Sequence, residues 1–161
     1  MRVGTGFDLH RLGAERPLKL AGVEIPGSPG LIAHSDGDVV FHALADAVLG
    51  AAGWTHDIGT LFPDDDPEWE GADSSQLLLR VLALVGAEWS IVNADCTVLC
   101  EAPKLSPHRD AMRASLAGVL GIAGTAMGLK FTTMEGLGPI GRGEAIACQA
   151  VVLLEPGEEL Q

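Results

Sequence analysis

Tyrosine is absent from this chain of 161 residues, and aromatic side chains make up only 4% of it. Basic residues are also scarce: 10 lysines and arginines stand against 22 acidic residues, so the formal net charge is −12. A field of that sign repels a polyanion, and we therefore expect no nucleic-acid partner. A small phosphorylated ligand is still compatible with this charge, but metal ions, backbone N–H groups or a few placed cations would have to hold it.

Long apolar runs and paired cysteines are missing as well. No apolar stretch approaches the roughly 18 residues that a membrane-spanning helix needs, and no basic segment followed by an apolar one marks an export signal. The three cysteines, Cys96, Cys100 and Cys148, form an odd set without a C-x-x-C motif, which is typical of reduced thiols. We expect a cytoplasmic protein with no membrane partner.

The composition that remains, 47% hydrophobic and 20% charged, suits one packed domain over residues 1–161. Alternating apolar patterns predict strands, which we expect at residues 2–7, 88–100, 126–135 and 145–154, with a short hairpin at 18–26. Helical periodicity with capping residues predicts helices, which we expect at 38–53, 74–87 and 106–121. Residues 27–38 and the acidic stretch 62–75 are expected as loops.

The expected helix caps are Asp38, Asp73 or Ser74, and Ser106 ahead of Pro107. The order of the elements predicts an α+β fold. Its core would be a single mixed β-sheet with helices packed on one face, in a split βαβ, ferredoxin-like arrangement.

The stretch GFDLH places Asp8 and His10 two residues apart behind the first expected strand. Because side chains alternate along a strand, the two would project from the same face. His42 lies in the first expected helix, with Asp38 and Asp46 each four residues away and so on the same helix face. One Asp and two His are a plausible Zn²⁺ ligand set, and Asp38 or Asp46 could accept the other ring N–H of His42. Spacing alone leaves open whether these residues bind a metal or form ordinary hydrogen-bonded pairs.

Two further segments could contact phosphate. Thr132, Thr133 and Glu135 precede a glycine-rich connection, where hydroxyls and backbone N–H groups can hold phosphate oxygens. Glu135 is a hard oxygen ligand suited to Mg²⁺ or Mn²⁺, although a tight turn at a sheet edge explains the same residues. Lys104 lies just before an expected helix N-terminus, where an anion or nucleotide can bind or a lysine can simply be solvated.

Seven stretches in order, from residue 1 to about residue 154, form a specific pattern: GTGFDLHRL, LIAHSDGDVVFHALADAVLGA, DIGTLFPDDDP, GADSSQLL, NADCTVLCEAPKLSPH, FTTMEGLG and GRGEAIACQAVVLL. Together they resemble the 2-C-methyl-D-erythritol 2,4-cyclodiphosphate synthases of the non-mevalonate isoprenoid pathway. The resemblance implies a lyase that converts 4-diphosphocytidyl-2-C-methyl-D-erythritol 2-phosphate to the cyclic diphosphate and CMP. In this reaction the 2-phosphate of the substrate attacks its own β-phosphorus, so the protein need not supply a covalent nucleophile.

The resemblance also implies cofactors and site residues. A zinc would be held by Asp8, His10 and His42, and a Mg²⁺ or Mn²⁺ would lie beside Glu135. His34 and Thr133 match the family's transition-state-stabilising positions. The positions that match substrate contacts are Asp8, Leu9, His10, His34, Ser35, Asp57, Ile58, Gly59, Phe62, Pro63, Asp64, Asp65, Asp66, Cys100, Glu101, Ala102, Pro103, Lys104, Leu105, Ser106, Thr132, Thr133, Met134, Glu135 and Arg142.

The family likeness implies a homotrimer with active sites between subunits, in which one chain supplies the cytidine pocket and its neighbour supplies the zinc. The chain departs from the common pattern where His56 stands beside Asp57 in a stretch one residue longer than usual. Met134 and Gly136 replace a frequent Thr and Lys, and Pro139 replaces a frequent Phe. The resemblance therefore does not extend to contacts made by these side chains, nor to the hydrophobic cavity at the trimer centre and its ligand.

Two other functions fit the same residues. In a zinc phosphohydrolase, water would occupy the open metal position and attack phosphorus. In a trimeric binding or scaffold protein, residual zinc would have no catalytic role. The reaction product distinguishes a phosphohydrolase from a synthase. The absence of turnover with Zn²⁺ and Mg²⁺ would indicate a binding or scaffold protein.

Overall fold

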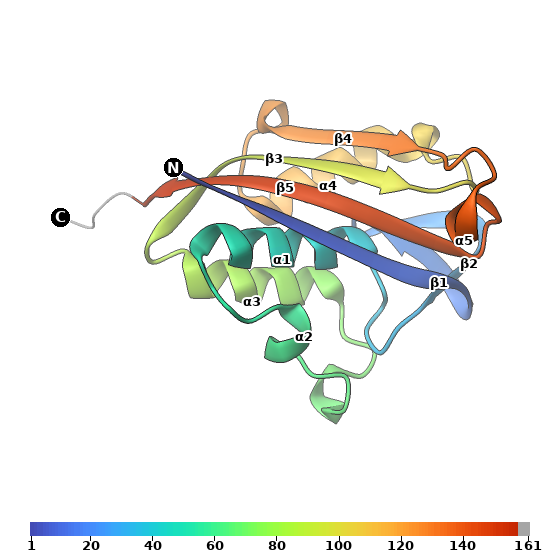
Figure 1. Cartoon of the computed structure of the whole chain (residues 1–161), viewed down its shortest axis with the longest axis horizontal. Coiled ribbons are helices and arrows are strands. Elements are labelled where there is room, and N and C mark those ends of the chain that lie inside the picture. The colour runs from blue at the N-terminus through green and yellow to red at the C-terminus, as the bar shows by residue number, and fades with distance from the viewer. Residues whose placement is uncertain (158–161) are drawn as a thin grey trace.

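Five strands form one mixed sheet in the order β2-β1-β5-β3-β4 in the computed structural model, which describes residues 1–157 (Figure 1). The strands are β1 (Arg2–Leu20), β2 (Val23–Ile32), β3 (Trp89–Leu99), β4 (Met127–Thr132) and β5 (Ala145–Pro156). Strand β5 runs antiparallel to both of its neighbours, β1 and β3. Strands β1 and β2 are also antiparallel, whereas β3 and β4 are parallel. The predicted α+β class with a mixed sheet is confirmed.

The helical segments join these strands. They are α1 (Val39–Ala52), α2 (Ile58–Leu61), η1 (Pro67–Trp69), α3 (Ser74–Val85), η2 (Ser106–His108), α4 (Arg109–Leu120), η3 (Gly124–Ala126) and α5 (Gly138–Gly141). Helix α1 packs on β1 and β5, α3 packs on α1, and α4 packs on β4 (Figure 1). The strand registers place Leu129 of β4, Cys96 of β3 and Ala150 of β5 on one face, and all three are buried. Helices α1 and α4 therefore cover the same face of the sheet, as predicted.

Two glycines let α1 approach β1 closely. A Cβ atom on Gly4 would lie 2.1 Å from the carbonyl oxygen of Ala47, and one on Gly6 would lie 2.0 Å from that of Ala43. Contacts this short do not occur in folded proteins, so any larger residue would push the helix away. The close approach brings the side chains of α1 next to those of β1.

The helix ends follow the predictions in part. The side chain of Asp38 accepts from the backbone N–H of Val40 at the start of α1, and that of Asp73 caps α3. Gly53 ends α1 in the left-handed conformation with a φ of 83°. The predicted cap at Ser106 is wrong, because the backbone at Leu105 is already helical and places Ser106 inside the first turn, without a side-chain cap bond.

Strands β1 and β2 are longer than the sequence predicted. After pairing with β5 as far as Arg11, β1 continues to Leu20 and pairs there with β2. The turn of this hairpin lies at Ala21 and Gly22, both with positive φ, which confirms the turn position but not the short length. The predicted loop 27–38 is correspondingly wrong in its first half, which belongs to β2.

The direct βαβ unit in the described chain is β3–α4–β4, whose two strands are neighbours. A split βαβ, ferredoxin-like topology stays a prediction. None of the helices within residues 1–157 has the length and apolar character to cross a membrane.

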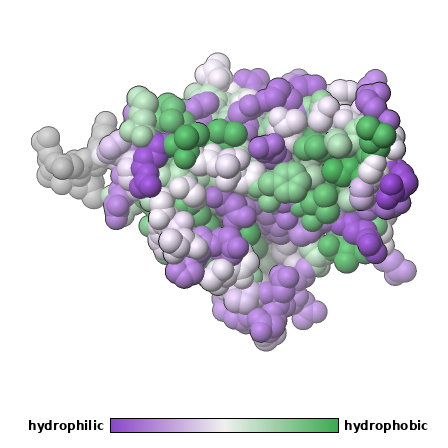
Figure 2. All heavy atoms as spheres, in the orientation of Figure 1, coloured by the Kyte–Doolittle hydropathy of each residue, from purple (hydrophilic) through white to green (hydrophobic). Residues whose placement is uncertain are grey.

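The sheet face opposite the helices is open and partly apolar. Val3, Phe7 and Leu9 of β1 are 69%, 56% and 44% exposed, and Val151 of β5 is 40% exposed. Figure 2 shows green, apolar side chains gathered in the region of these strands. Exposed apolar side chains on such a face are shielded from water only when a partner or another segment covers them.

Candidate functional site

Three predicted ligands meet between β1 and α1. Oδ2 of Asp8 lies 3.0 Å from Nδ1 of His42 and 3.2 Å from Nε2 of His10. The two ring nitrogens are 3.1 Å apart. Donor atoms bonded to one tetrahedral Zn²⁺ stand about 3.4 Å from one another, given bond lengths near 2.1 Å. The geometry therefore fits a single cation with an open fourth position, and the predicted Asp-His-His group is confirmed.

Electrostatics within this group favour a positive charge at its centre. Burial opposes ionisation of Asp8, but its interactions with the two histidines, the hydrogen bond with His42 first among them, outweigh burial and lower the pKa of Asp8. Burial likewise opposes charge on His42, yet the bond with Asp8 raises the pKa of His42. Burial dominates at His10 and lowers its pKa, which keeps that ring neutral and able to donate a lone pair. Without a cation, the Asp8 carboxylate favours the protonated form of His42. A bound cation would balance the charge of Asp8 in place of that proton.

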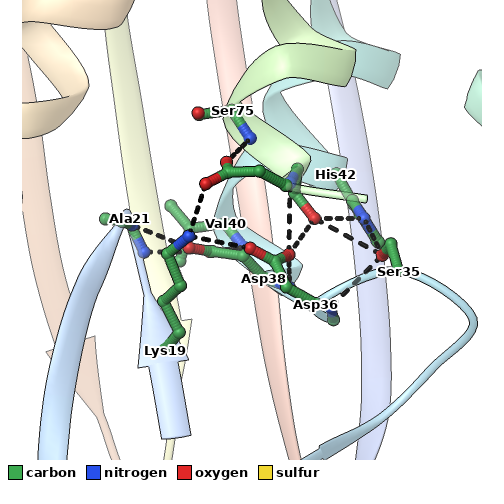
Figure 3. A network of polar contacts seen from close by, with 12 residues as sticks. Lys19, Ala21, Ser35, Asp36, Asp38, Val40, His42 and Ser75 are labelled. Carbon is green, nitrogen blue, oxygen red and sulfur yellow. Dashed lines mark hydrogen bonds and ion pairs between the residues drawn. The ribbon is translucent and has the colours of Figure 1, made fainter. Parts of the chain in front are cut away.

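The remote nitrogen of His42 points away from the group. Nε2 of His42 lies 2.9 Å from Oγ of Ser74 and 3.1 Å from Oγ of Ser35 (Figure 3). The predictions that Asp38 or Asp46 orients this ring are wrong. Asp46 accepts instead from the backbone N–H of Ile58 at 2.8 Å, and Asp38 accepts from backbone N–H groups at the hairpin turn and helix start.

The metal-ligand group opens into a cavity of about 320 Å³. Other predicted site residues that line it are His34, Ser35, Ile58, Gly59, Phe62 and Asp64. Leu9, by contrast, projects from the opposite face of β1, because side chains alternate along the strand, and it is 44% exposed there.

The acidic segment 62–73 forms one wall of this cavity. The backbone N–H of Gly71 donates to the carbonyl of His34 at 2.8 Å, and the carbonyl of Asp66 lies 3.3 Å from Nε2 of His34. Trp69 packs edge-on against Phe62 with ring centroids 5.0 Å apart. These contacts hold the segment against His34. The predicted substrate contacts Pro63, Asp65 and Asp66 belong to the segment but do not line the cavity.

Asp57 serves the local backbone. Its carboxylate accepts from the N–H and the hydroxyl of Thr60, which caps α2 and lowers the pKa of Asp57. The neighbouring His56 is exposed. Neither side chain lines the cavity beside the metal-ligand group.

A second cavity of about 420 Å³ lies at the ends of β3 and β4. The predicted residues that line it are Cys100, Glu101, Pro103, Lys104, Leu105, Ser106, Thr132 and Thr133. Ala102 belongs to the same turn without lining the cavity, and Glu101 accepts from the backbone N–H of Met134 at 3.1 Å. The cavity is lined by the ammonium of Lys104, by the hydroxyls of Ser106, Thr132 and Thr133, and by the first residue of a helical segment. This combination of groups suits an anionic ligand.

The predicted Glu135 and Thr133 lie together, with the Thr133 hydroxyl donating to Oε1 of Glu135 at 2.6 Å. Thr133 lines the second cavity, Glu135 lines neither of the two, and the two cavities have no lining residue in common. Arg142 lies in neither cavity, because its guanidinium pairs with Glu144 at 2.7 Å on the surface.

Comparison with known proteins adds to this geometry. The sequence model of the YgbB family matches residues 1–155. The chain belongs to the YgbB family.

This YgbB-family chain is 52% identical over 155 residues to the 2-C-methyl-D-erythritol 2,4-cyclodiphosphate synthase of Synechococcus sp. (strain JA-2-3B'a(2-13)), covering 96% of the chain and 98% of that relative. It is 53% identical over 156 residues to the synthase of the same name from Marinobacter nauticus, with coverage of 96% and 98%. A solved structure of 2C-methyl-D-erythritol-2,4-cyclodiphosphate synthase in a CDP-bound form matches with a TM-score of 0.86 and 43% identity, over 96% of this chain and 100% of that one. The family resemblance read from the sequence is confirmed.

Sequence reasoning missed several residues of this YgbB-family site. Trp69 and Leu77 line the first cavity, and Arg109 and Phe131 line the second, where the guanidinium of Arg109 lies 4.7 Å from the Phe131 ring centroid. Trp69 stood in a segment read only as an acidic loop. Ser74 was read only as a helix cap, although its place in the stretch GADSSQLL was a signal that it belonged to the site.

Proposed function

We propose that this chain is a 2-C-methyl-D-erythritol 2,4-cyclodiphosphate synthase, a phosphorus–oxygen lyase of non-mevalonate isoprenoid biosynthesis. It converts 4-diphosphocytidyl-2-C-methyl-D-erythritol 2-phosphate to the cyclic diphosphate and CMP. One observation carries the proposal: the group Asp8, His10 and His42 opens into a cavity, in a chain that aligns over 96% of its length with synthases of this name.

The reaction joins two ends of one flexible molecule. An oxygen of the 2-phosphate attacks the β-phosphorus, the bond from that phosphorus to the bridging oxygen breaks, and CMP leaves with the bridging oxygen. No side chain forms a covalent bond, so catalysis consists of positioning and charge stabilisation. His34, which lines the first cavity, and Thr133, which lines the second, are the proposed transition-state stabilisers.

Two cations complete the proposed site. Two imidazole nitrogens and one carboxylate are a donor set that Zn²⁺ favours, so Asp8, His10 and His42 would hold zinc. The hard oxygens of Glu135 suit Mg²⁺ or Mn²⁺. When bound, the two cations polarise the β-phosphate and neutralise phosphate charge. A chain with a net charge of −12 has few other means of holding a phosphorylated substrate.

The second cavity suits the cytidine and α-phosphate portion of the substrate. Residues 100–106 and Thr132 surround a hollow in which Lys104 and Arg109 supply positive charge. The methylerythritol portion would lie in the first cavity, against residues 57–59 and 62–66. Arg142 would contact a further phosphate. Because the three cysteines are free and buried, we place the enzyme in the reducing cytoplasm.

We further propose a homotrimer with active sites between subunits. Support comes from the two cavities, which lie apart in the chain yet hold residues needed for one substrate. Support also comes from the open sheet face, where Phe7 and Val151 are exposed apolar side chains that a neighbouring subunit would cover. Sedimentation at micromolar concentration measures the assembly, and a monomer would contradict this part of the proposal.

The reaction product tests the function. The purified chain, supplied with Zn²⁺, Mg²⁺ and the cytidine diphospho-substrate, is followed by ³¹P NMR. We expect signals of a cyclic diphosphate and of CMP in equal amounts. Linear phosphates would identify a zinc phosphohydrolase instead, and the absence of any turnover with both metals present would favour a binding protein.

A further inference from the structure

A chain of polar contacts begins at Nε2 of His42, on the opposite side of the ring from the Nδ1 that lies against Asp8. Figure 3 shows Ser35, Asp36 and Lys19 in this network beside His42. Its first link is Ser74, whose hydroxyl oxygen is 2.9 Å from Nε2 of His42. Ser74 is fully buried, so its hydroxyl finds its partners within the protein. Ser35, also buried, lies 3.1 Å from the same nitrogen and 3.4 Å from the Ser74 hydroxyl.

The direction of these hydrogen bonds is set by the second link, Asp36. The Ser74 hydroxyl donates to Oδ1 of Asp36. A serine hydroxyl has a single proton to donate, so toward His42 the Ser74 oxygen acts as an acceptor. The hydrogen in that contact must then belong to Nε2 of His42.

The third link is the set of hydrogen-bond donors around the Asp36 side chain. The ammonium of Lys19 donates to Oδ2 of Asp36 at 2.9 Å, and the backbone N–H groups of Ser74 and Asp38 each donate to Oδ1 at 3.2 Å. Burial opposes the charge of Lys19, but its hydrogen bonds with Asp73 and Asp36 outweigh burial and raise its pKa. In all of these contacts, including the one with the Ser74 hydroxyl, the oxygens of Asp36 accept.

We propose that Ser74 and Asp36 are positioning residues that keep a hydrogen on Nε2 of His42 and thereby leave its Nδ1 lone pair to the cation. The inference rests on the proposed metal centre and adds to it the groups that orient one ligand. Histidines that bind metals commonly donate their other N–H to such a partner, and loss of that partner weakens metal binding about 10- to 100-fold. Because Ser74 directly follows the acidic segment 62–73, the same contact ties the wall of the cavity to the metal ligand.

The first measurement is the affinity for Zn²⁺ alone, by competition with a chromogenic chelator at fixed pH. We expect Ser74→Ala to raise the Zn²⁺ dissociation constant about 10-fold or more, and Asp36→Asn to raise it less, since the amide oxygen still accepts from Ser74. Ser75→Ala is the matched control for the first change, because it removes a hydroxyl one residue further along the same helix. Asp73→Asn is the control for the second, because Asp73 is the other carboxylate bonded to Lys19.

The second measurement separates orientation of the ring from general loss of structure. In protein labelled with ¹⁵N-histidine, the Nε2–H resonance of His42 should be protected from solvent exchange in the wild type, with and without Zn²⁺. Protection should fall in Ser74→Ala and persist in Ser75→Ala, while circular dichroism remains unchanged. If Ser74→Ala does not fold, the comparison of Asp36→Asn with Asp73→Asn decides whether these contacts orient the His42 ring.

Wild-type Zn²⁺ affinity and a protected Nε2–H in Ser74→Ala and Asp36→Asn would overturn the inference while leaving the metal centre intact. Failure of the wild-type chain to bind Zn²⁺ would instead refute the proposed zinc. The Nε2–H measurement on metal-free protein would still decide whether Ser74 and Asp36 orient the ring.

Discussion

Nδ1 of His42 lies 3.0 Å from Oδ2 of Asp8, although 34 positions separate the two residues in the chain. One comes from a strand and the other from a helix that crosses it, and each is fixed by its own backbone rather than by a flexible loop. A rigid pair of this kind pre-arranges the charges that a cation meets, so little reorganisation accompanies binding. Changes to either the strand or the helix should therefore weaken metal binding before they destabilise the fold.

Replacement of His42 by alanine should remove stoichiometric zinc and lower turnover about 100-fold or more, since a pair of remaining ligands cannot enclose the cation. Thermal unfolding of the metal-free protein should change little. Metal analysis of the purified variant, combined with the ³¹P assay, tests both expectations. His56→Ala is the control, because His56 is exposed and lies outside the cluster. Full zinc occupancy in His42→Ala would refute the ligand assignment.

The close approach of α1 to β1 should depend on Gly6. In Gly6→Ala the added methyl would meet the carbonyl oxygen of Ala43, so we expect a loss of about 1–3 kcal/mol in unfolding free energy and a weaker Zn²⁺ affinity as the helix is displaced. Gly118→Ala is the matched control, because a Cβ there meets nothing within 4 Å. In that helix alanine should stabilise by about 0.5–1 kcal/mol. Urea titrations of both variants make the comparison, and equal effects would show that the space at Gly6 is not needed.

Part of this site could be predicted from sequence for physical reasons. Strand alternation correctly placed Asp8 and His10 on one face, and Asp38 was correctly read as the cap of the helix that carries His42. The contact with His42 could not be derived from periodicity, because it depends on how closely α1 approaches β1. That distance follows from Gly4 and Gly6, whose effect appears only when the helix is packed against them.

The misread parts have a similar origin. The strand predicted at 2–7 and the hairpin predicted at 18–26 left the residues between them unassigned. Gly13 and Pro17 lie in that stretch and are poor strand formers, but β1 continues through them with shifts in its register against β2. The ring of His42 was expected to bond with Asp38 or Asp46, its neighbours in the helix. Its actual partner, Ser74, comes from another helix, and such tertiary hydrogen bonds leave no trace in local spacing.

Stability should depend on pH through Asp38. Complete burial raises the pKa of this carboxyl from 3.8 to about 6, although N–H groups of Gly22 and Ala21 favour the anion. A raised folded-state pKa gives stability that is fully present below pH 3.8 and is lost as pH rises through about 6. The unfolding free energy of the wild type minus that of Asp38→Asn should therefore fall by about 2 kcal/mol between about pH 4 and pH 7. Urea unfolding in a metal chelator measures this difference; a flat or rising profile would contradict it.

Glu135 should affect the second cation without affecting the first. Glu135→Gln keeps the size of the side chain and an acceptor for the Thr133 hydroxyl but removes the charge. We expect unchanged zinc content and a Mg²⁺ requirement shifted about 10-fold or more to higher concentration. Turnover measured over a Mg²⁺ titration at saturating Zn²⁺ gives the shift. Glu144→Gln serves as the control on the paired surface carboxylate, and a superimposable titration for Glu135→Gln would exclude the role.

The arrangement of active sites between subunits can be tested by mixing two inactive chains. His42→Ala removes a ligand from the first cavity, and Lys104→Ala removes the lysine from the second. If one chain supplies the metal centre and its neighbour supplies the nucleotide pocket, a mixed assembly contains some sites in which both halves are intact. If a single chain supplied both halves, every site would keep one defect whatever its neighbours.

The two arrangements predict different amounts of recovered activity. Random assembly of equal amounts of the two chains should give about one quarter of wild-type activity per site, because half of the pockets are intact and half of those face an intact metal centre. The two variants are unfolded together, refolded in the presence of Zn²⁺ and assayed, with each variant refolded alone as the control. Recovery should pass through a maximum at equal proportions and vanish at either end. No recovery, with normal assembly by sedimentation, would place the whole site within one chain and would require the two cavities to be brought together by a movement of the chain itself.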